Sequence, residues 1–141
     1  MKTPLRYPGG KSKAVAKLWQ WLPAEITEYR EPFLGGGSMA IEITKRYPDL
    51  SIWVNDFYEP LHNFWVQLRD NGEYLHDQLQ QLKSRYPDQG SAKGLFLDGK
   101  DKVNDLSLDK KDRAVAFYVV NKCSFSGLTE SSAFSAQASD S

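Results

Sequence analysis

Three consecutive glycines, at positions 35–37, stand between an apolar run and a helix-like segment in the stretch EPFLGGGSMAIEI (residues 31–43). A turn without side chains lets the backbone approach a ligand closely, and a following helix offers its N-terminus to a phosphate. Asp56 comes about twenty residues later, where a carboxylate can accept hydrogen bonds from ribose hydroxyls. This combination predicts a site for a cofactor that contains a nucleoside.

A second cluster, Gly9-Gly10-Lys11-Ser12, resembles the end of a P-loop, which binds the phosphates of a nucleotide. The first glycine of a P-loop would fall at position 5, which is Leu5, and too few residues precede it to form a strand. A P-loop is therefore the weakest of the nucleotide interpretations.

The glycine run alone fits more than one ligand. Gly35 and Gly37 occupy the first two positions of the dinucleotide pattern G-x-G-x-x-G, and Ala40 occupies the third. S-adenosylmethionine has no phosphate but uses the same close approach of the backbone. A turn without any ligand, with Asp56 capping a helix, would also explain these residues, so the pattern leaves three interpretations open.

The segments around the glycines alternate as in a βαβ unit. Apolar residues at helical spacing predict a helix over residues 11–22, which Pro23 ends. Residues 26–33 and 50–56 are predicted to be strands, and residues 39–46 a helix between them. Strands joined by such a crossover are parallel, so the fold class is α/β.

The pattern becomes mainly helical after Asp56. Residues 61–68 and 75–86 each present a helical apolar face, and Asn71-Gly72 separates them. Residues 88–107 are polar with three glycines and are predicted to be a long loop. Asp109 and Asp112 then begin another helix, with acids at its positive end. We therefore predict two parts, residues 1–56 and residues 57–141.

Three motifs, in this order and at this spacing, resemble the Dam-type DNA adenine methyltransferases, which use S-adenosyl-L-methionine. They are PLRYPGGKSK (residues 4–13), EPFLGGGS (31–38) and VNDFYEPL (54–61). The resemblance implies that residues 1–56 are the amino-terminal, cofactor-binding part of a Rossmann-like catalytic domain. Residues 57–141 would be an inserted, mainly helical DNA-recognition domain that is truncated at its end.

The resemblance also implies a set of cofactor-binding residues. Lys11 would lie near the methionine carboxylate, for which a lysine supplies a point charge, and Asp56 would hold the ribose. The implied cofactor site comprises Tyr7, Gly9, Gly10, Lys11, Glu31, Phe33, Gly35, Gly37 and Asp56.

The stretch YVVNKCSFSGLTESS (residues 118–132) resembles the hairpin with which the family contacts double-stranded DNA. Phe125 would wedge into the duplex beside a flipped adenine, since an enzyme that modifies a base amine must take that base out of the stack. Alternatively, Phe125 is a core aromatic at the end of a helix. The implied DNA-binding residues are Asn121, Lys122, Phe125, Ser126 and Leu128.

Members of this family transfer the methyl group with an Asp-Pro-Pro-Tyr or similar motif. The chain has seven prolines, none adjacent, so we predict no catalytic residue within it. The resemblance implies a fragment of an adenine methyltransferase that is active only with a missing carboxy-terminal half as partner. Because two parallel strands alone leave edges and faces uncovered, we expect the isolated chain to be poorly stable or to self-associate.

Composition argues against several other classes. A single cysteine, Cys123, and two histidines make a disulfide or a metal site improbable. No apolar run approaches the roughly 20 residues that span a bilayer, and the start is unlike a signal peptide, so we predict a cytoplasmic protein with no membrane partner. Residues 1–24 carry five basic and no acidic side chains, which suits an anionic ligand.

Two rival functions stay open at this stage. One is a non-catalytic remnant that binds DNA or S-adenosylmethionine, or acts as an interaction module. The other is a dinucleotide-dependent oxidoreductase, which leaves the YPGGK motif at residues 7–11 unexplained.

Overall fold

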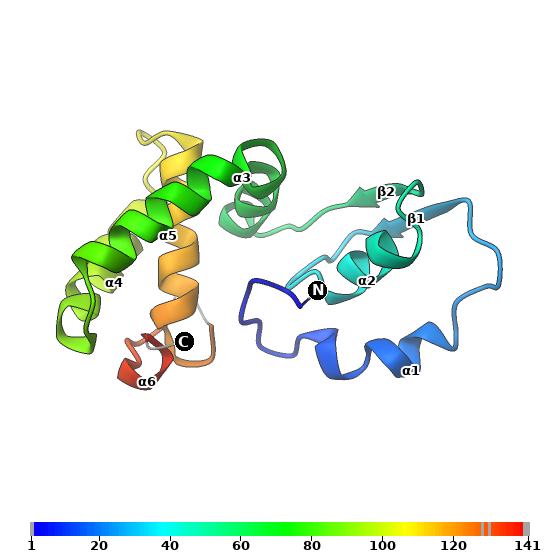
Figure 1. The fold of residues 1–141 in the computed structure, drawn as a ribbon, viewed down its shortest axis with the longest axis horizontal. Coiled ribbons are helices and arrows are strands. Elements are labelled where there is room, and N and C mark those ends of the chain that lie inside the picture. The colour runs from blue at the N-terminus through cyan, green and yellow to red at the C-terminus, as the bar shows by residue number, and fades with distance from the viewer. Residues whose placement is uncertain (1, 128, 130, 140–141) are drawn as a thin grey trace. The chain divides into compact units, whose positions relative to one another are not determined.

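The computed structural model describes residues 2–127, 129 and 131–139 of the chain. The chain divides into two compact units, Met1–Phe57 and Tyr58–Ser141 (Figure 1). Because each unit has its own packed interior, the fold of each can be followed separately.

Unit 1 is built on two parallel strands, β1 (Glu28–Glu31) and β2 (Ser51–Val54), joined by helix α2 (Ser38–Arg46). The register pairs Glu28 with Ser51 and Glu31 with Val54. The predicted strand, turn, helix and strand and the parallel pairing are confirmed. Helix α2 packs on both strands, and the short elements η1 (Lys11–Lys13) and α1 (Val15–Trp19) pack on α2 (Figure 1).

The single helix predicted over residues 11–22 is wrong. The chain forms only the one-turn η1 and the five-residue α1, and none of their residues is fully buried. Trp19 of α1 contacts the end of α2 and the residue after it: its ring lies 3.9 Å from the guanidinium carbon of Arg46 and stacks on Tyr47. So short a helix gains little from its own hydrogen bonds, and one aromatic contact is not enough to extend it.

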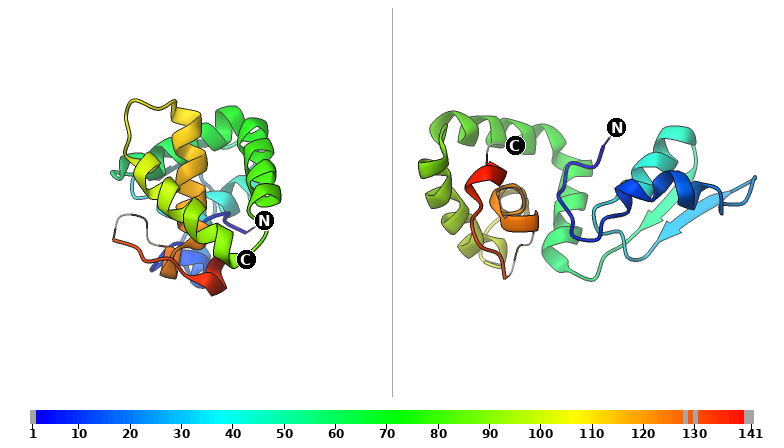
Figure 2. Two further views of the ribbon diagram at one scale, coloured as in Figure 1. Left: turned by 90° about the vertical axis from the view of Figure 1, so that its left-hand side faces the viewer. Right: turned by 90° about the horizontal axis from the view of Figure 1, so that it is seen from below.

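Unit 2 is helical and is centred on α5 (Lys110–Cys123), which Asp109 caps through a bond from the Lys111 amide. Helices α3 (Glu59–Arg85) and α4 (Gln89–Val103) pack on either side of α5 (Figure 2). Helix α3 changes direction at Asn71, whose φ of −136° and ψ of 34° are not helical. The two helices predicted on either side of Asn71-Gly72 are therefore present, joined end to end.

The long loop predicted over residues 88–107 is wrong, because most of it is α4. The helix begins with a capping box, in which Asp88 accepts from the Ser91 amide and the Ser91 side chain accepts from the Asp88 amide. One face is buried through Ala92, Phe96, Gly99 and Val103. The spacing of these four residues is helical, and Gly99 allows α4 to lie close to α5, so glycine here promotes helix packing and does not break the helix.

The chain after α5 folds back on itself. The one-turn η2 (Phe125–Gly127) comes directly after Ser124, which forms an antiparallel bridge with Phe134, and the short helix α6 (Ala136–Ser139) follows. Across the described residues of both units, no helix combines the length and the apolar character needed to cross a bilayer.

Candidate functional site

The glycine turn leads from β1 into α2. Gly35 and Gly37 have φ of 54° and 71°, a left-handed conformation that residues with a side chain rarely adopt. The turn therefore favours glycine at these two positions. The Leu34 amide donates to the Asn55 carbonyl at 2.9 Å, and the Gly37 amide donates to the Leu34 carbonyl at 3.0 Å. The turn is thus fastened to the residues that follow β2.

Asp56 lies directly at this turn. Its Oδ2 accepts a hydrogen bond from the Gly35 amide at 2.8 Å. Because parallel strands end at the same edge of a sheet, the acid after β2 and the glycines after β1 come together although 21 positions separate them.

The amino-terminal segment packs against the same turn. Leu5 is buried with 4% of its surface exposed, and Thr3 Oγ1 donates to the Gly36 carbonyl. The Tyr7 ring lies so close to Gly35 that a Cβ on this glycine would fall 2.9 Å from Tyr7 Cε1. The YPGGK motif therefore forms a wall beside the glycines.

These segments enclose a pocket of about 190 Å³ within unit 1. Eight of the nine predicted cofactor-binding residues line it: Tyr7, Gly9, Gly10, Lys11, Phe33, Gly35, Gly37 and Asp56. Leu34, Gly36 and Ser38 complete the lining. Residues from three separate motifs thus converge on one cavity, and their role in binding stays a prediction.

Glu31, the ninth predicted residue, is connected to the pocket through Lys11. The Lys11 ammonium lies 3.0 Å from Glu31 Oε1, and the Tyr29 hydroxyl donates to Oε2 at 3.0 Å. Glu31 is only 7% exposed, whereas the Lys11 side chain is 46% exposed. A buried carboxylate therefore orients the terminus of a pocket lysine.

Tyr29 was not among the predicted site residues. Burial, and then the charge and hydrogen bond of Glu31, raise the pKa of the Tyr29 hydroxyl well above its ordinary value. The hydroxyl is thus protonated at neutral pH and acts as a donor to Glu31. The available signal was its position two residues before Glu31 on a strand, which places both side chains on one face.

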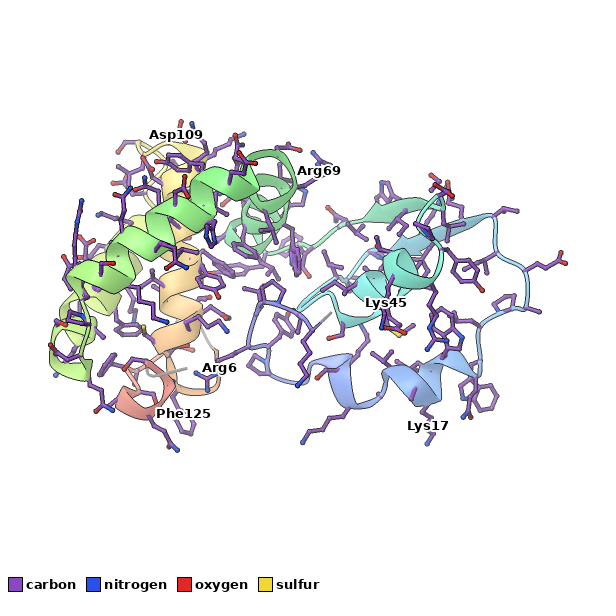
Figure 3. The ribbon with its side chains drawn as sticks, viewed as in Figure 1. Arg6, Lys17, Lys45, Arg69, Asp109 and Phe125 are labelled. Carbon is purple, nitrogen blue, oxygen red and sulfur yellow. The ribbon has the colours of Figure 1, made fainter. Side chains whose placement is uncertain are left out.

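The predicted DNA-binding residues lie in different environments. Phe125 is 67% exposed and points away from the end of α5 (Figure 3), which argues against the alternative of a core aromatic. Lys122 is partly buried, with its ammonium 5.5 Å from the Tyr118 ring centroid. Ser126 belongs to η2, and Leu128 lies outside the described residues.

Asn121, also predicted to contact DNA, is buried in the structure, and its contact with DNA stays a prediction. Asn121 is only 2% exposed, and its side-chain amide donates to the Gly127 carbonyl at 2.9 Å. Its position inside unit 2, facing its own loop, makes it a support for the turn that carries Phe125.

The sequence model of the D12 class N6 adenine-specific DNA methyltransferases matches residues 7–139, nearly the whole chain. The chain belongs to this family. The resemblance to adenine-specific DNA methyltransferases that the three motifs indicated is thereby confirmed. Mixed α/β structure with a parallel two-stranded sheet is consistent with such an assignment.

Two curated relatives support the same family. The chain is 25% identical over 137 residues to the type II methyltransferase M.MjaIII of Methanocaldococcus jannaschii, covering 91% of this chain and 47% of the relative. It is 29% identical over 126 residues to the type II methyltransferase M1.LlaDCHI of Lactococcus lactis subsp. cremoris, covering 87% and 41%. The chain thus spans about half the length of the curated relatives that it matches, or somewhat less.

Within the described part of the chain, no three histidine, cysteine, aspartate or glutamate side chains gather as metal ligands.

Proposed function

We propose that the unit 1 pocket binds S-adenosyl-L-methionine and that the chain forms the amino-terminal part of a site-specific DNA adenine methyltransferase. One observation carries the proposal. A single cavity brings together Tyr7 and Lys11, the glycine turn and Asp56, which belong to three motifs of a family that methylates adenine. A Rossmann-like continuation of the two-stranded sheet is part of this proposal.

The Lys11–Glu31 pair suits the amino-acid part of the cofactor. The methionine moiety carries an ammonium and a carboxylate group close together, and Lys11 and Glu31 offer a cation and an anion 3.0 Å apart. Lys11 would pair with the ligand carboxylate while Glu31 accepts from the ligand ammonium. A ligand with two phosphates would instead find in Lys11 a cation whose charge the buried Glu31 already partly neutralises.

Asp56 and Phe33 of the lining suit the nucleoside part. Asp56 is partly exposed at the turn and provides a carboxylate for the ribose hydroxyls. Phe33 lines the pocket with 77% of its surface exposed, a large apolar face that a ligand would cover. The pocket of about 190 Å³ is smaller than the usual 300–1,000 Å³ of complete ligand sites. It would therefore hold part of the cofactor.

Double-stranded DNA is the proposed partner of unit 2. Phe125 is the residue of unit 2 that is most suited to insert into the duplex. A 67% exposed aromatic ring on a short turn can enter a base stack when an adenine is extruded. Lys122 in the last turn of α5, Ser126 of η2, and Leu128, the next residue in the sequence after η2, remain proposed contacts. Since both named relatives are type II methyltransferases, we further propose a restriction-modification context and a cytoplasmic location.

Transfer of the methyl group would move the sulfonium methyl of S-adenosylmethionine to the exocyclic N6 of adenine, with loss of one proton from that nitrogen. These 141 residues contain no two adjacent prolines, and we propose that polypeptide outside them supplies an Asp-Pro-Pro-Tyr or similar motif. We propose that this partner segment also covers the open sheet face that exposes Arg30 and Trp53. The chain alone would bind cofactor without transferring methyl groups.

The test is calorimetric titration of the chain with S-adenosylmethionine, S-adenosylhomocysteine and NADH. The proposal predicts saturable binding of the two S-adenosyl compounds and none of NADH. The Asp56→Ala variant should bind S-adenosylmethionine at least about tenfold more weakly, the effect of losing one charge-assisted hydrogen bond. Binding of NADH alone would instead support the oxidoreductase.

A further inference from the structure

The middle residue of the glycine turn is constrained differently from its neighbours. Gly35 and Gly37 have the positive φ that favours glycine, whereas Gly36 does not, so its backbone would accept a side chain. The obstacle at Gly36 is steric. A Cβ there would fall 2.9 Å from Tyr7 Cβ and 3.5 Å from Tyr7 Cγ, and the first distance is too short for two carbons.

Tyr7 belongs to a segment that is attached to the rest of unit 1 on both sides of this contact. Before Tyr7, Thr3 Oγ1 donates to the Gly36 carbonyl and Leu5 is buried. After it, Lys11 pairs with Glu31. Residues 3–11, which we name the amino-terminal strap, thus lie along the turn.

The pocket is complete only when the strap lies on the turn. Its lining includes Tyr7, Gly9, Gly10 and Lys11 from the strap, and the remaining lining comes from residues 33–38 and Asp56. The ring of Tyr7 also lies against Gly35, where a Cβ would come within 2.9 Å of Cε1. Any displacement of Tyr7 therefore moves one whole wall of the pocket.

We propose that Gly36 is a positioning residue for the cofactor site: by having no side chain it seats Tyr7, and it thereby holds the amino-terminal strap as the second wall of the pocket. Gly36 acts through Tyr7 on the ligand. This inference rests on the proposed function for the identity of the ligand, S-adenosylmethionine, and it adds a residue that the G-x-G pattern leaves free.

The test begins with hydrogen exchange of the Gly36→Ala variant without ligand. Amide exchange should become faster in residues 3–11 and stay unchanged in β1, β2 and α2. A general loss of stability would instead make exchange faster in β1, β2 and α2 as well. The affinity for S-adenosylmethionine should fall about tenfold, within the coupling range of residues in contact. The matched control is Gly94→Ala, where nothing lies within 4 Å of the new Cβ, and which should alter neither measurement.

A double-mutant cycle with Tyr7→Gly identifies the path of the effect. Removing the Tyr7 side chain removes the clash, so Gly36→Ala should change the affinity by less than about twofold in the Tyr7→Gly background. The same tenfold loss in that background would overturn the proposal, because Gly36 would then act without Tyr7. Parent-like affinity and exchange in Gly36→Ala would overturn it as well.

Failure of the inference can be told from failure of the proposed function. Suppose that the parent chain binds no S-adenosylmethionine but that Gly36→Ala still makes amide exchange faster in residues 3–11. Gly36 then does hold the strap in place, and the assigned ligand is wrong. If the parent binds and Gly36→Ala leaves residues 3–11 protected, the ligand holds and the seating is wrong.

Discussion

Asp56 and Gly35 are joined by a hydrogen bond of 2.8 Å from the Gly35 amide to Oδ2 of the carboxylate. This bond connects the acid after β2 to the glycine turn after β1. Asp56 therefore holds the shape of the turn before any ligand arrives, a role separate from the proposed contact with the ribose. A residue that both shapes and contacts a site reduces the ordering needed when the ligand binds.

Two substitutions at Asp56 separate these roles. Asp56→Ala should lower the free energy of unfolding of unit 1 by about 1–3 kcal/mol, because the Gly35 amide loses a charged acceptor. Asp56→Asn retains an amide oxygen that can accept from Gly35 and should lower stability by less than about 1 kcal/mol. Urea denaturation followed by hydrogen exchange of unit 1 amides measures both, with the exposed Asp49→Ala as control. Equal stability of Asp56→Ala and the parent would show that the bond does not hold the turn.

Glu59 and Arg113 should contribute unequally to unit 2. Arg113 is 4% exposed, donates to both carboxylate oxygens of Glu59 and also donates to the Val103 carbonyl at 3.1 Å, whereas the Glu59 side chain is 54% exposed. Glu59→Ala leaves a buried guanidinium without its carboxylate and should cost roughly 3 kcal/mol. Arg113→Met leaves a carboxylate that water can reach and should cost about 1–2 kcal/mol.

Urea denaturation of Glu59→Ala and Arg113→Met measures which variant loses more stability, and Arg69→Ala is the control. The Arg69 side chain is 74% exposed beside Asp70, so its loss should change stability by less than about 0.5 kcal/mol. A larger loss for Arg113→Met than for Glu59→Ala would contradict the argument.

Gly99 and Gly94 of α4 form a matched pair. A Cβ at Gly99 would lie 3.0 Å from Val120 Cγ2 and 3.5 Å from the Ala116 carbonyl oxygen, whereas nothing lies within 4 Å at Gly94. Gly99→Ala should therefore lower the free energy of unfolding by about 1–2 kcal/mol, because the added methyl group overpacks the contact between α4 and α5. Gly94→Ala should raise it by up to about 1 kcal/mol through helix propensity. Thermal unfolding of the two variants measures both effects. A gain in stability in both variants would contradict the close packing of α4 on α5.

Phe125 of η2 and Asn121 of α5, whose side chain holds η2 through Gly127, should act differently. Phe125→Ala removes an exposed ring and should leave stability within about 0.5 kcal/mol of the parent. It should weaken binding of a DNA duplex by about 1–3 kcal/mol if the ring stacks on bases. Asn121→Ala leaves the Gly127 carbonyl without this donor and should cost about 1–3 kcal/mol of stability. Fluorescence anisotropy with labelled duplex at low salt measures binding, and parent-like binding by Phe125→Ala would remove it from the interface.

Local sequence signals predicted unit 1 well where the determinants are local. Residues 26–33, the glycines at 35–37 and residues 39–46 predict strand, turn and helix without distant contacts. The helix predicted over residues 11–22 is longer than α1, because apolar spacing alone does not show whether the rest of the protein offers a surface on which the helix can pack. Trp19 stacks on Tyr47, but the 80% exposed Trp21 did not complete a buried face.

Long-range contacts account for most of what the sequence did not predict. Gly90, Gly94 and Gly99 were counted as helix breakers, but Gly99 packs on Val120 of α5, a contact that spacing cannot reveal. The motif containing Asn121 implied an exposed side chain, and only the fold of the following turn shows that it is buried. The pairing of Lys11 with Glu31 likewise depends on the strap lying beside β1.

The central claim is that S-adenosylmethionine binds in the unit 1 pocket, and amide chemical shifts test it directly. Titration of the isotopically labelled chain should shift the amides of Lys11, Gly35, Gly37 and Asp56 in a saturable way. The amides of α4 and α5 should not move. Saturable shifts confined to residues 58–139, or binding that leaves the amides of the glycine turn unchanged, would contradict the claim.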